Sequence, residues 1–557
     1  IAVILGPSNI VSDNNHIYSE RGFYNTLTEQ AELLDRSVLT NQGKKLVGDS
    51  LFYDRVIGYG EAFDNVRMTD TINKNMLTGD YCFYNELTDS AFATKRAVAI
   101  DYSQGDSLFM HGDTLQMVSY NLNTDSLFRL MKAYHKVRMY RTDVQGVCDS
   151  LVYNSKDSCM TMYTDPILWN DGRCGEECAM LEARVPDSRD ITGNLMMPGF
   201  TAPKLLWVQR HEPEIFSRVA KVLLPKDYLR LRMTGDFASD MSDAAGTLWL
   251  DVAKRDWSDT MLDACQLSRE QMPKLYEGSE ITGALTPSVA QGWNMPAVPV
   301  VAGGGDNAAG AVGVGMADAG QAMLSLGTSG VYFAVSDGYR SNPQSAVHSF
   351  CHALPGKWHL MSVMLSAASC LDWAAKLTGL GTVPALIDAA QQANEEADAV
   401  WFLPYLSGER TPHNNPNAKG VFFGLTHQHG PAELARAVLE GVGYALADGM
   451  DVVHECGLRP TSITLIGGGA RSAYWRQMLA DISGHQLDYR TGGDVGPALG
   501  AARLAQIAVN PNTPLASLLP QLALEQQHPP EAARHARYAE RREVFRKIYQ
   551  QLQPLMS

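Results

Sequence analysis

The stretch VAGGGDNAAGAVGVGMADAGQAMLSLGTSG, residues 301–330, places one carboxylate between two glycine-rich turns. Asp306 directly follows the glycines at 303–305, which allow a ligand to approach the backbone closely beside the acid. The turn at 327–330, Gly-Thr-Ser-Gly, offers backbone N–H groups and two hydroxyls to phosphate oxygens. An acid and a phosphate-binding turn are the minimum for moving a phosphoryl group onto a hydroxyl. The alternative interpretation is two tight turns between buried strands with no ligand.

Length, charge and cysteine usage limit the classes of protein. A chain of 557 residues should hold two to four domains. The net charge of −15 disfavours nucleic acid or an anionic membrane as partner, and no apolar run is long enough for a transmembrane segment. The nine cysteines are dispersed, and the close pair Cys174 and Cys178 has no histidine at zinc-site spacing. This pattern predicts reduced thiols, no metal site and a cytoplasmic location.

Composition changes sharply near residue 165. Pro7 is the only one of the 26 prolines that precedes residue 166, and all nine tryptophans follow it. A single domain rarely changes character so abruptly, so we place a boundary between Asp165 and Pro166.

The part before this boundary repeats a short unit. GDSLFY at 48–53, GDYCFY at 79–84, GDTL at 112–115 and GVCDSLVY at 146–153 recur, and Gly, Asn and Asp separate the units. Short apolar or alternating runs between turn residues predict strands, and repeated strand units must stack to bury their apolar face. Residues 1–165 are therefore predicted to form an all-β repeat, an elongated jelly roll or solenoid-like ribbon.

This part resembles the OstA-like family of lipopolysaccharide-transport proteins. The resemblance rests on GPSNI at 6–10, NHIYSERG at 15–22 and the Gly-Asp-x-x-x-Tyr units. It implies a periplasmic protein whose open β-channel shelters the acyl chains of a glycolipid. A β-repeat domain without a ligand is the alternative.

The part after the boundary alternates strand-like and helix-like segments. ITLI at 463–466 predicts a strand, glycines follow at 467–469, and a helix is expected over 472–482 with Gly484 as its C′ residue. Pro431 suits a first helical position, and Glu433 suits the first turn of that helix. This alternation predicts α/β layers.

Residues 166–557 resemble the xylulokinase branch of the FGGY carbohydrate kinase family. The matching motifs are ILWNDGR at 167–173, TGNLMMPGF at 192–200, GGGDNAAG at 303–310, LGTSG at 326–330, GERTPH at 408–413 and LIGGGAR at 465–471. The resemblance implies two actin-like (ribonuclease-H-like) lobes, a partial first lobe at 166–319 and a second lobe at 320–557. It also implies ATP and Mg²⁺ as cofactors and D-xylulose as substrate; gluconate, ribulose and glycerol are alternatives.

The same resemblance assigns roles to individual residues. Asp306 matches the general base, and Asn307 matches a ligand of the sugar hydroxyls. Trp169, Asp171 and Arg173 match residues that shape the first lobe near the sugar. For residues 409–413, a structural role and a ligand contact both stay open, and the glycines at 467–469 could instead serve only helix–strand packing. Gly327 and Thr328 match the loop that holds the β- and γ-phosphates, and Gly468 and Gly469 match the turn against adenosine.

Two elements of this family are missing. Its members open with a strand and an Asp-x-Gly-Thr turn that positions Mg²⁺, and they carry a Gln-Met-His-Gly segment that touches the sugar. At the start of this chain, Ile4 and Pro7 stand where the acid and the threonine would be, and neither side chain can ligate a hard cation. We therefore expect no protein ligand for the metal, low activity, and exposed strand edges and apolar surface in the partial lobe.

Several interpretations of the whole chain follow. The leading one is a chimeric sugar kinase whose first part is replaced; the chain could form a homodimer. The alternatives are a glycolipid-binding protein acting through residues 1–165, and a fusion that does neither.

Overall fold

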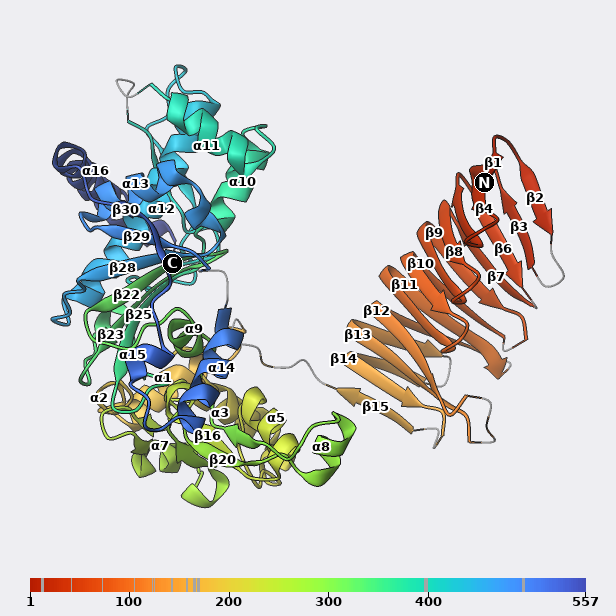
Figure 1. Ribbon diagram of the computed structural model, residues 1–557, viewed down its shortest axis with the longest axis horizontal. Coiled ribbons are helices and arrows are strands. Elements are labelled where there is room, and N and C mark those ends of the chain that lie inside the picture. The colour runs from red at the N-terminus through yellow and green to blue at the C-terminus, as the bar shows by residue number, and fades with distance from the viewer. Residues whose placement is uncertain are drawn as a thin grey trace. The chain divides into compact units, whose positions relative to one another are not determined.

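The computed structural model describes residues 1–11, 15–41, 43–72, 74–104, 106–122, 124, 126–141, 144–156, 159–163, 167, 171–394, 399–492 and 496–556. The chain divides into two compact units, Ile1–Ile167 and Leu168–Ser557 (Figure 1). The boundary expected between Asp165 and Pro166, and Trp169 beside it, lie outside the described residues.

The first unit is one 15-stranded sheet, and its strand pairs are antiparallel. The expectation of an all-β N-terminal part is confirmed. From β8 onward each strand pairs with the next, and β9 also pairs with β7, from which a branch β7-β6-β3-β2 continues. The strands are β1 (Ala2–Ile4), β2 (Ser8–Val11), β3 (Asn15–Ser19), β4 (Arg21–Asn25), β5 (Gln30–Leu34), β6 (Ser37–Asn41), β7 (Lys44–Gly48), β8 (Ser50–Asp54), β9 (Tyr59–Asp70), β10 (Asn75–Asn85), β11 (Ser90–Gln104), β12 (Asp106–Tyr120), β13 (Phe128–Arg141), β14 (Val144–Asn154) and β15 (Cys159–Tyr163).

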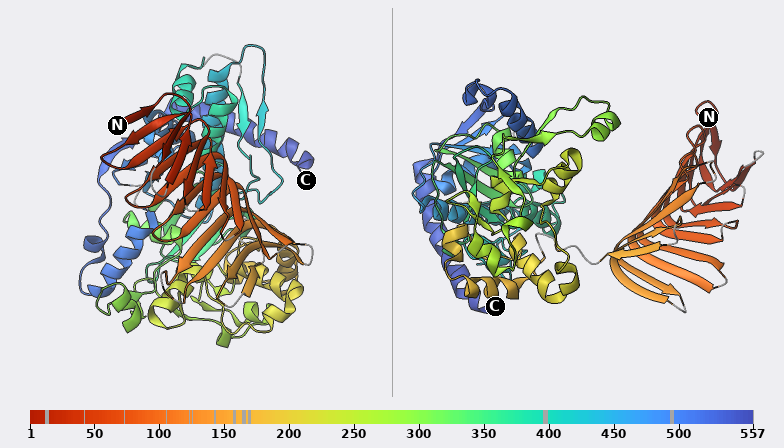
Figure 2. Two further views of the ribbon diagram at one scale, coloured as in Figure 1. Left: turned by 90° about the vertical axis from the view of Figure 1, so that its right-hand side faces the viewer. Right: turned by 90° about the horizontal axis from the view of Figure 1, so that it is seen from below.

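Alternating burial explains how this sheet holds together. In β5, Ala31 and Leu33 are buried whereas their neighbours are more exposed, as the two-residue period of a strand requires. The inward residues of successive strands form one apolar cluster that includes Leu115 and Leu151. Both panels of Figure 2 show the strands of this unit arranged as a fan that leaves one side open.

The second unit begins with short strands among helices. Its strands form three two-stranded sheets, β16–β19, β17–β18 and β20–β21. Trp249 and Leu181 lie at the centre of its apolar core. The elements are α1 (Gly175–Arg184), α2 (Ser188–Thr192), α3 (Thr201–His211), α4 (Pro213–Phe216), α5 (Pro225–Thr234), β16 (Ala238–Asp240), α6 (Met241–Ala245), β17 (Leu250–Asp251), β18 (Asp256–Trp257), α7 (Asp259–Ala264), β19 (Lys274–Tyr276), β20 (Ile281–Ala284), α8 (Pro287–Gly292), β21 (Pro299–Val301) and α9 (Asp306–Gly313).

The rest of the second unit is built on a seven-stranded sheet of order β24-β25-β23-β22-β28-β29-β30. A further pair, β26–β27, stands beside it. The elements are β22 (Gln321–Leu326), β23 (Gly330–Ser336), β24 (His348–Cys351), β25 (Trp358–Met364), α10 (Ser369–Leu377), α11 (Val383–Gln392), β26 (Trp401–Leu403), β27 (Val421–Phe423), α12 (Pro431–His454), β28 (Ser462–Ile466), α13 (Ala473–Ser483), β29 (Leu487–Arg490), α14 (Gly496–Val509), α15 (Leu515–Leu518), β30 (Leu524–His528) and α16 (Ala532–Leu552).

Helices cover both faces of this sheet. Along β22, Ala322 and Leu324 belong to the cluster that contains α12, whereas Met323 belongs to the cluster that contains Ala311 of α9. Because successive side chains of a strand point to opposite faces, α12 and α9 lie on opposite sides of the sheet (Figure 1). The predicted α/β layers are therefore present.

The predicted helix ends are confirmed in two places. Helix α12 begins at Pro431, and the carboxylate of Glu433 accepts a hydrogen bond from the N–H of Gly430 at 2.9 Å. Helix α13 begins after Ser472, whose hydroxyl accepts from the N–H of Trp475, and it ends at Gly484 in the left-handed conformation.

Candidate functional site

Two glycine-rich turns lie side by side because the strands that lead into them are neighbours. Strands β22 and β28 pair in parallel, with Ser325 opposite Ile466 at their carboxyl ends. The turn at 327–330 follows β22, and the turn at 467–469 follows β28. In open α/β sheets, ligands bind beyond the carboxyl ends of such strands. The structure thus brings together the two turns that the sequence assigned to the nucleotide.

Glycine is needed where the second turn touches the first strand. Gly467 has φ of 89°, and a Cβ there would lie 2.9 Å from the carbonyl of Leu326. At Gly469, a Cβ would lie 2.7 Å from the ring of Trp475 and 2.9 Å from the Cβ of Leu326. At Gly468, by contrast, a Cβ would meet no atom within 4 Å. Gly467 and Gly469 therefore allow the turn to lie close to Leu326, and Gly468 has open space in front of it.

The turn at 327–330 is anchored from behind. The N–H of Ala368 donates to the carbonyl of Gly327 at 2.9 Å, and the N–H of Ala367 donates to the carbonyl of Thr328 at 2.9 Å. The hydroxyl of Ser369 also donates to the carbonyl of Thr328, at 2.9 Å. The side chain of Thr328 is exposed. With its carbonyls held by the start of α10, the turn keeps one face free for a ligand.

Asp306 begins helix α9. Its carboxylate is exposed, and its Oδ1 accepts hydrogen bonds from the backbone N–H of Asn307 at 2.7 Å and from the Asn307 side chain at 3.0 Å. An exposed carboxylate with an amide beside it can accept a proton from a sugar hydroxyl and orient a neighbouring one.

The turn before Asp306 is held by α6. The hydroxyl of Ser242 accepts a hydrogen bond from the N–H of Gly305 at 3.0 Å and donates its own hydrogen to the Oδ2 of Asp240. Asp240 is fully buried, and the same oxygen caps α6 by accepting from the N–H of Ser242 at 2.8 Å. A chain of hydrogen bonds thus runs from a buried acid to the residue before Asp306.

Lys226 balances the charge of this buried acid. Its ammonium lies 2.6 Å from Asp240, 2.7 Å from Asp227 and 3.3 Å from Asp243. Burial disfavours the charge of Lys226, but the carboxylates of Asp240 and Asp243 outweigh it, so the pKa of Lys226 is raised. The ammonium occupies the space between the acids, so this cluster does not suit a metal ion.

Other parts of the described chain also offer no ready metal site. Among the residues that the structure describes, no group of three or more His, Cys, Asp or Glu side chains is placed to hold a metal ion. A site that holds Mg²⁺ through one or two carboxylates together with substrate phosphates would not form such a group.

Helix α14 packs closely against α9, the helix that begins with Asp306. A Cβ on Gly500 would overlap the carbonyl oxygen of Ala309, and a Cβ on Gly313 would lie 3.0 Å from the carbonyl oxygen of Gly496. The two helices can approach this closely only because these positions carry no side chain. Asp306 is thus carried by a helix that is packed tightly against a second one.

Two other groups of predicted residues have structural contacts. The guanidinium of Arg173 donates to Asp171 at 2.8 Å and lies over the ring of Trp207 at 5.3 Å. Glu409 is buried, and its Oε1 accepts from the backbone N–H groups of Leu365 at 3.1 Å and Arg410 at 2.7 Å. Burial raises the pKa of Glu409 to about 8. These contacts favour the structural interpretation of the 409–413 segment.

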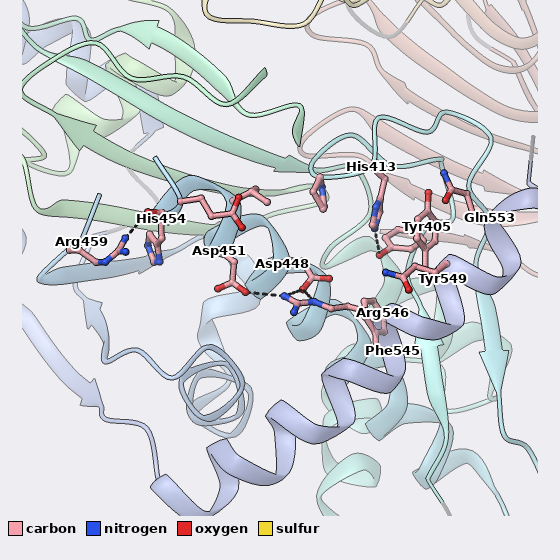
Figure 3. Close-up of a pocket in the computed structure, with 14 residues that line it drawn as sticks. Tyr405, His413, Asp448, Asp451, His454, Arg459, Phe545, Arg546, Tyr549 and Gln553 are labelled. Carbon is pink, nitrogen blue, oxygen red and sulfur yellow. Dashed lines mark hydrogen bonds and ion pairs between the residues drawn. The ribbon is translucent and has the colours of Figure 1, made fainter. Parts of the chain in front are cut away.

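A cavity of about 720 Å³ lies elsewhere in the second unit, between α12, α16 and the loop after β26 (Figure 3). In it, the hydroxyl of Tyr405 contacts the Nε2 of His413 at 3.0 Å, and Arg546 pairs with Asp448 at 2.7 Å and Asp451 at 2.9 Å. None of the predicted base, sugar or nucleotide residues lines it. This cavity is therefore not the candidate site.

Sequence reasoning missed Lys226, Asp240 and Ser242. The available signal was the density of acids and serines in SDMSD at 239–243. It missed the role of Gly500 as well, although Gly496 and Gly500 are spaced one helical turn apart, which favours close helix packing.

Comparison with protein families gives three matches. Residues 150–313 match the N-terminal domain, and residues 322–509 the C-terminal domain, of the FGGY family of carbohydrate kinases. Residues 10–104 match OstA-like protein.

Individual relatives agree with these matches. Xylulose kinase of Escherichia coli (strain K12) is 82% identical over 391 residues, which are 70% of this chain and 81% of the relative. Xylulose kinase of Klebsiella pneumoniae is 75% identical over 401 residues, 72% of this chain and 83% of the relative. The crystal structure of a xyloylose kinase from Brucella ovis superposes with a TM-score of 0.65 at 46% identity, covering 70% of this chain and 79% of that one. None of the described helices is long and apolar enough to cross a membrane.

Proposed function

Since the chain belongs to the FGGY family of carbohydrate kinases, we propose that it transfers the γ-phosphoryl group of ATP to D-xylulose, giving D-xylulose 5-phosphate. Its substrate is inferred from relatives of 82% and 75% identity that carry the name xylulose kinase. The observation that carries the proposal is the parallel pairing of β22 with β28, which sets both glycine turns at the carboxyl ends of neighbouring strands. Asp306, the first residue of α9, is exposed.

Each candidate site residue has one role in the proposed mechanism. Asp306 accepts the proton of the attacking sugar hydroxyl, and Asn307 orients a neighbouring hydroxyl of the sugar. Gly327 and Thr328 hold the β- and γ-phosphates, and Gly468 and Gly469 lie against adenosine. The transition state of phosphoryl transfer is loose, so positioning matters more than the strength of the base. Mg²⁺, when bound with ATP, neutralises charge on the phosphates.

We expect turnover far below that of the intact relatives. The match leaves about a fifth of the E. coli relative unrepresented, because it covers 81% of that protein. Among the described residues, no group of three or more His, Cys, Asp or Glu side chains is placed to hold a metal ion. Loss of one group that stabilises transition-state charge typically costs about 10²–10³-fold in kcat.

The test is sugar-dependent release of ADP by the purified chain with Mg²⁺-ATP. D-xylulose should stimulate ADP release above the sugar-free rate, whereas gluconate, ribulose and glycerol should stimulate it less. Equal stimulation by all four sugars would contradict the assigned substrate. Absence of any stimulation, with ATP still protecting the second unit from proteolysis, would leave nucleotide binding as its only activity.

A second candidate function belongs to the first unit. Its sheet encloses a groove of about 180 Å³ whose apolar lining includes methionines from several strands, with Lys44, Arg129 and Lys132 among the residues around them. Flexible methionines adapt to irregular apolar ligands. Arg129 pairs with Asp89, which also lines the groove, at 2.8 Å, so the proposal rests on the apolar lining. We propose that this groove binds the acyl chains of a glycolipid such as lipopolysaccharide. The methionines are Met68, Met76, Met110, Met117 and Met131.

Fluorescent lipopolysaccharide tests this second proposal on the full chain. Saturable binding should be lost in Met117→Asp, because Met117 lines the groove. It should persist in Met162→Asp, since Met162 is 51% exposed and lies outside the groove lining. Binding that is unaffected by Met117→Asp would contradict the proposal.

A further inference from the structure

Strand β9 of the first unit bends back over itself. Along β9, Lys44 of β7 lies opposite Asp70, and Tyr84 of β10 lies opposite Gly60. Ten residues separate these two positions, which would be about 33 Å in a straight strand. Yet the Nζ of Lys44 donates a hydrogen bond to the hydroxyl of Tyr84 at 2.6 Å. Because two side chains cannot span such a distance, the two ends of β9 lie in layers that face each other.

Register shifts explain how the sheet bends. The pairing of β9 with β10 shifts between Gly79 and Tyr81, and Asp64 and Asn65 of β9 have φ of 53° and 50°. The pairs β11–β12, β12–β13 and β13–β14 each contain a shift as well. A bulge bends its strand and increases the local twist, so bulges in successive strands fold the whole sheet. The groove of the proposed glycolipid site lies inside this fold.

Lys44 and Tyr84, which we call the cross-groove pair, meet between the two layers. Besides the hydrogen bond, the ammonium of Lys44 lies 4.6 Å from the centre of the Tyr84 ring. The hydroxyl of Tyr84 donates in turn to Asp89 at 3.0 Å, and Asp89 pairs with Arg129 of β13 at 2.8 Å. Hydrogen bonds to charged groups are about twice as strong as neutral ones. The tyrosine is therefore anchored on its own layer while it holds the lysine of the other.

The cross-groove pair stands between two hollows. One is the groove of about 180 Å³, and the other has about 330 Å³ and an apolar lining that includes Leu39 and Leu46. Lys44, Met68 and Tyr84 line both hollows. An apolar chain that fills one hollow therefore meets the cross-groove pair before it can extend into the other.

We propose that the cross-groove pair sets the length of the acyl chain that the first unit binds. A chain that fits within one hollow binds with the hydrogen bond intact, whereas a longer chain must break this bond or leave its end in water. This inference rests on the proposed glycolipid binding and adds to it the residues that select chain length. The competing interpretation is one continuous groove in which the pair only fastens the two layers together.

The experiment measures, by calorimetry, the binding of fatty acids with eight, twelve and sixteen carbons to the full chain, each below its aggregation concentration. A buried methylene contributes about 0.8 kcal/mol, or roughly fourfold in affinity. In the wild type the gain should stop at the cross-groove pair, so the sixteen-carbon acid should bind within about threefold of the twelve-carbon acid. In Lys44→Ala the gain should continue, and the sixteen-carbon acid should bind more tightly than the twelve-carbon acid by roughly tenfold or more.

Control variants make the result specific to Lys44. Lys95→Ala removes an exposed lysine that lines neither hollow, and it should behave as the wild type. Lys44→Arg keeps a donor for Tyr84 and should also retain the wild-type length dependence. If Lys44→Ala does not fold, Lys44→Met takes its place, because it lacks the ammonium donor but keeps an apolar stem.

The outcomes separate this inference from the function on which it rests. Binding with the same length dependence in the wild type and in Lys44→Ala would overturn the role of the cross-groove pair and leave the proposed apolar ligand site standing. Absence of binding by all three acids, in the wild type and in every variant, would contradict the proposed glycolipid binding and this inference together.

Discussion

The hydroxyl of Ser242 accepts a hydrogen bond from the backbone N–H of Gly305 at 3.0 Å. This contact joins α6 to the turn that leads into Asp306, across a separation of 63 residues. The candidate base is therefore held in place by a residue that is distant in the sequence.

Removal of this hydroxyl should lower both stability and activity. In Ser242→Ala, the partly buried N–H of Gly305 loses its acceptor and the buried Asp240 loses a donor, which should cost about 1–3 kcal/mol in the free energy of unfolding. We expect kcat for D-xylulose to fall roughly tenfold with little change in the KM for ATP. Chemical denaturation and steady-state kinetics measure the two effects. Ser517→Ala, at an exposed position, is the control; equal kcat in both variants would contradict the positioning role.

The packing of α14 on α9 should be intolerant of a side chain. Gly500→Ala places a methyl group on the carbonyl oxygen of Ala309, so the helices must separate, at a cost of about 1–3 kcal/mol. Gly310→Ala is the matched control on α9, because its Cβ would meet no atom within 4 Å and alanine has the better helix propensity. Thermal unfolding should rank Gly310→Ala above the wild type and Gly500→Ala below it. The reverse order would show that the helices are not packed as described.

Substitutions of Gly468 and Gly469, in the turn assigned to adenosine, should have different effects on ligand binding and on packing. Gly469→Ala forces its Cβ against Trp475 and Leu326, so it should lower the free energy of unfolding. Gly468→Ala meets open space, so it should leave stability within about 1 kcal/mol of the wild type but weaken ATP binding. Calorimetric titration with ATP decides this. Unchanged affinity in Gly468→Ala would indicate that this turn serves only helix–strand packing.

Glu409 should make stability depend on pH. Its pKa is raised from 4.5 to about 8 by burial, so the folded state holds a proton that the unfolded state has already released. The stabilisation is complete below about pH 4.5 and is lost as pH rises through 8, with a total on the order of 5 kcal/mol. Denaturation of Glu409→Gln between pH 5 and 9 should show a weaker decline than the wild type. A decline of the same steepness in the variant would mean that other groups cause it.

The sequence predicted the elements with strong local signals. Residues 463–466 and 472–482 appear as β28 and α13, and Gly484 ends that helix, because turn glycines and short apolar runs act locally. Pro431 and Glu433 likewise predicted the start of α12. The all-β first part followed from its repeated units.

Contacts between distant segments could not be predicted in this way. The Ser242–Gly305 hydrogen bond and the Gly500–Ala309 approach depend on how helices pack, and neither leaves a periodic pattern in the sequence. The placement of Lys226 among three acids also escaped prediction, because a single lysine next to an aspartate is typical of a solvent-exposed helix end. These are the contacts that position Asp306.

The most direct test compares Asp306→Asn with Asp318→Asn in sugar-dependent ADP release. Both wild-type carboxylates are exposed, but only Asp306 lies at the start of α9 in the candidate site. If Asp306 is the base, its variant should lose D-xylulose-dependent turnover by about 10²–10⁴-fold while ATP still protects the second unit from proteolysis, and Asp318→Asn should match the wild type. Near-normal turnover in Asp306→Asn would contradict the proposed mechanism.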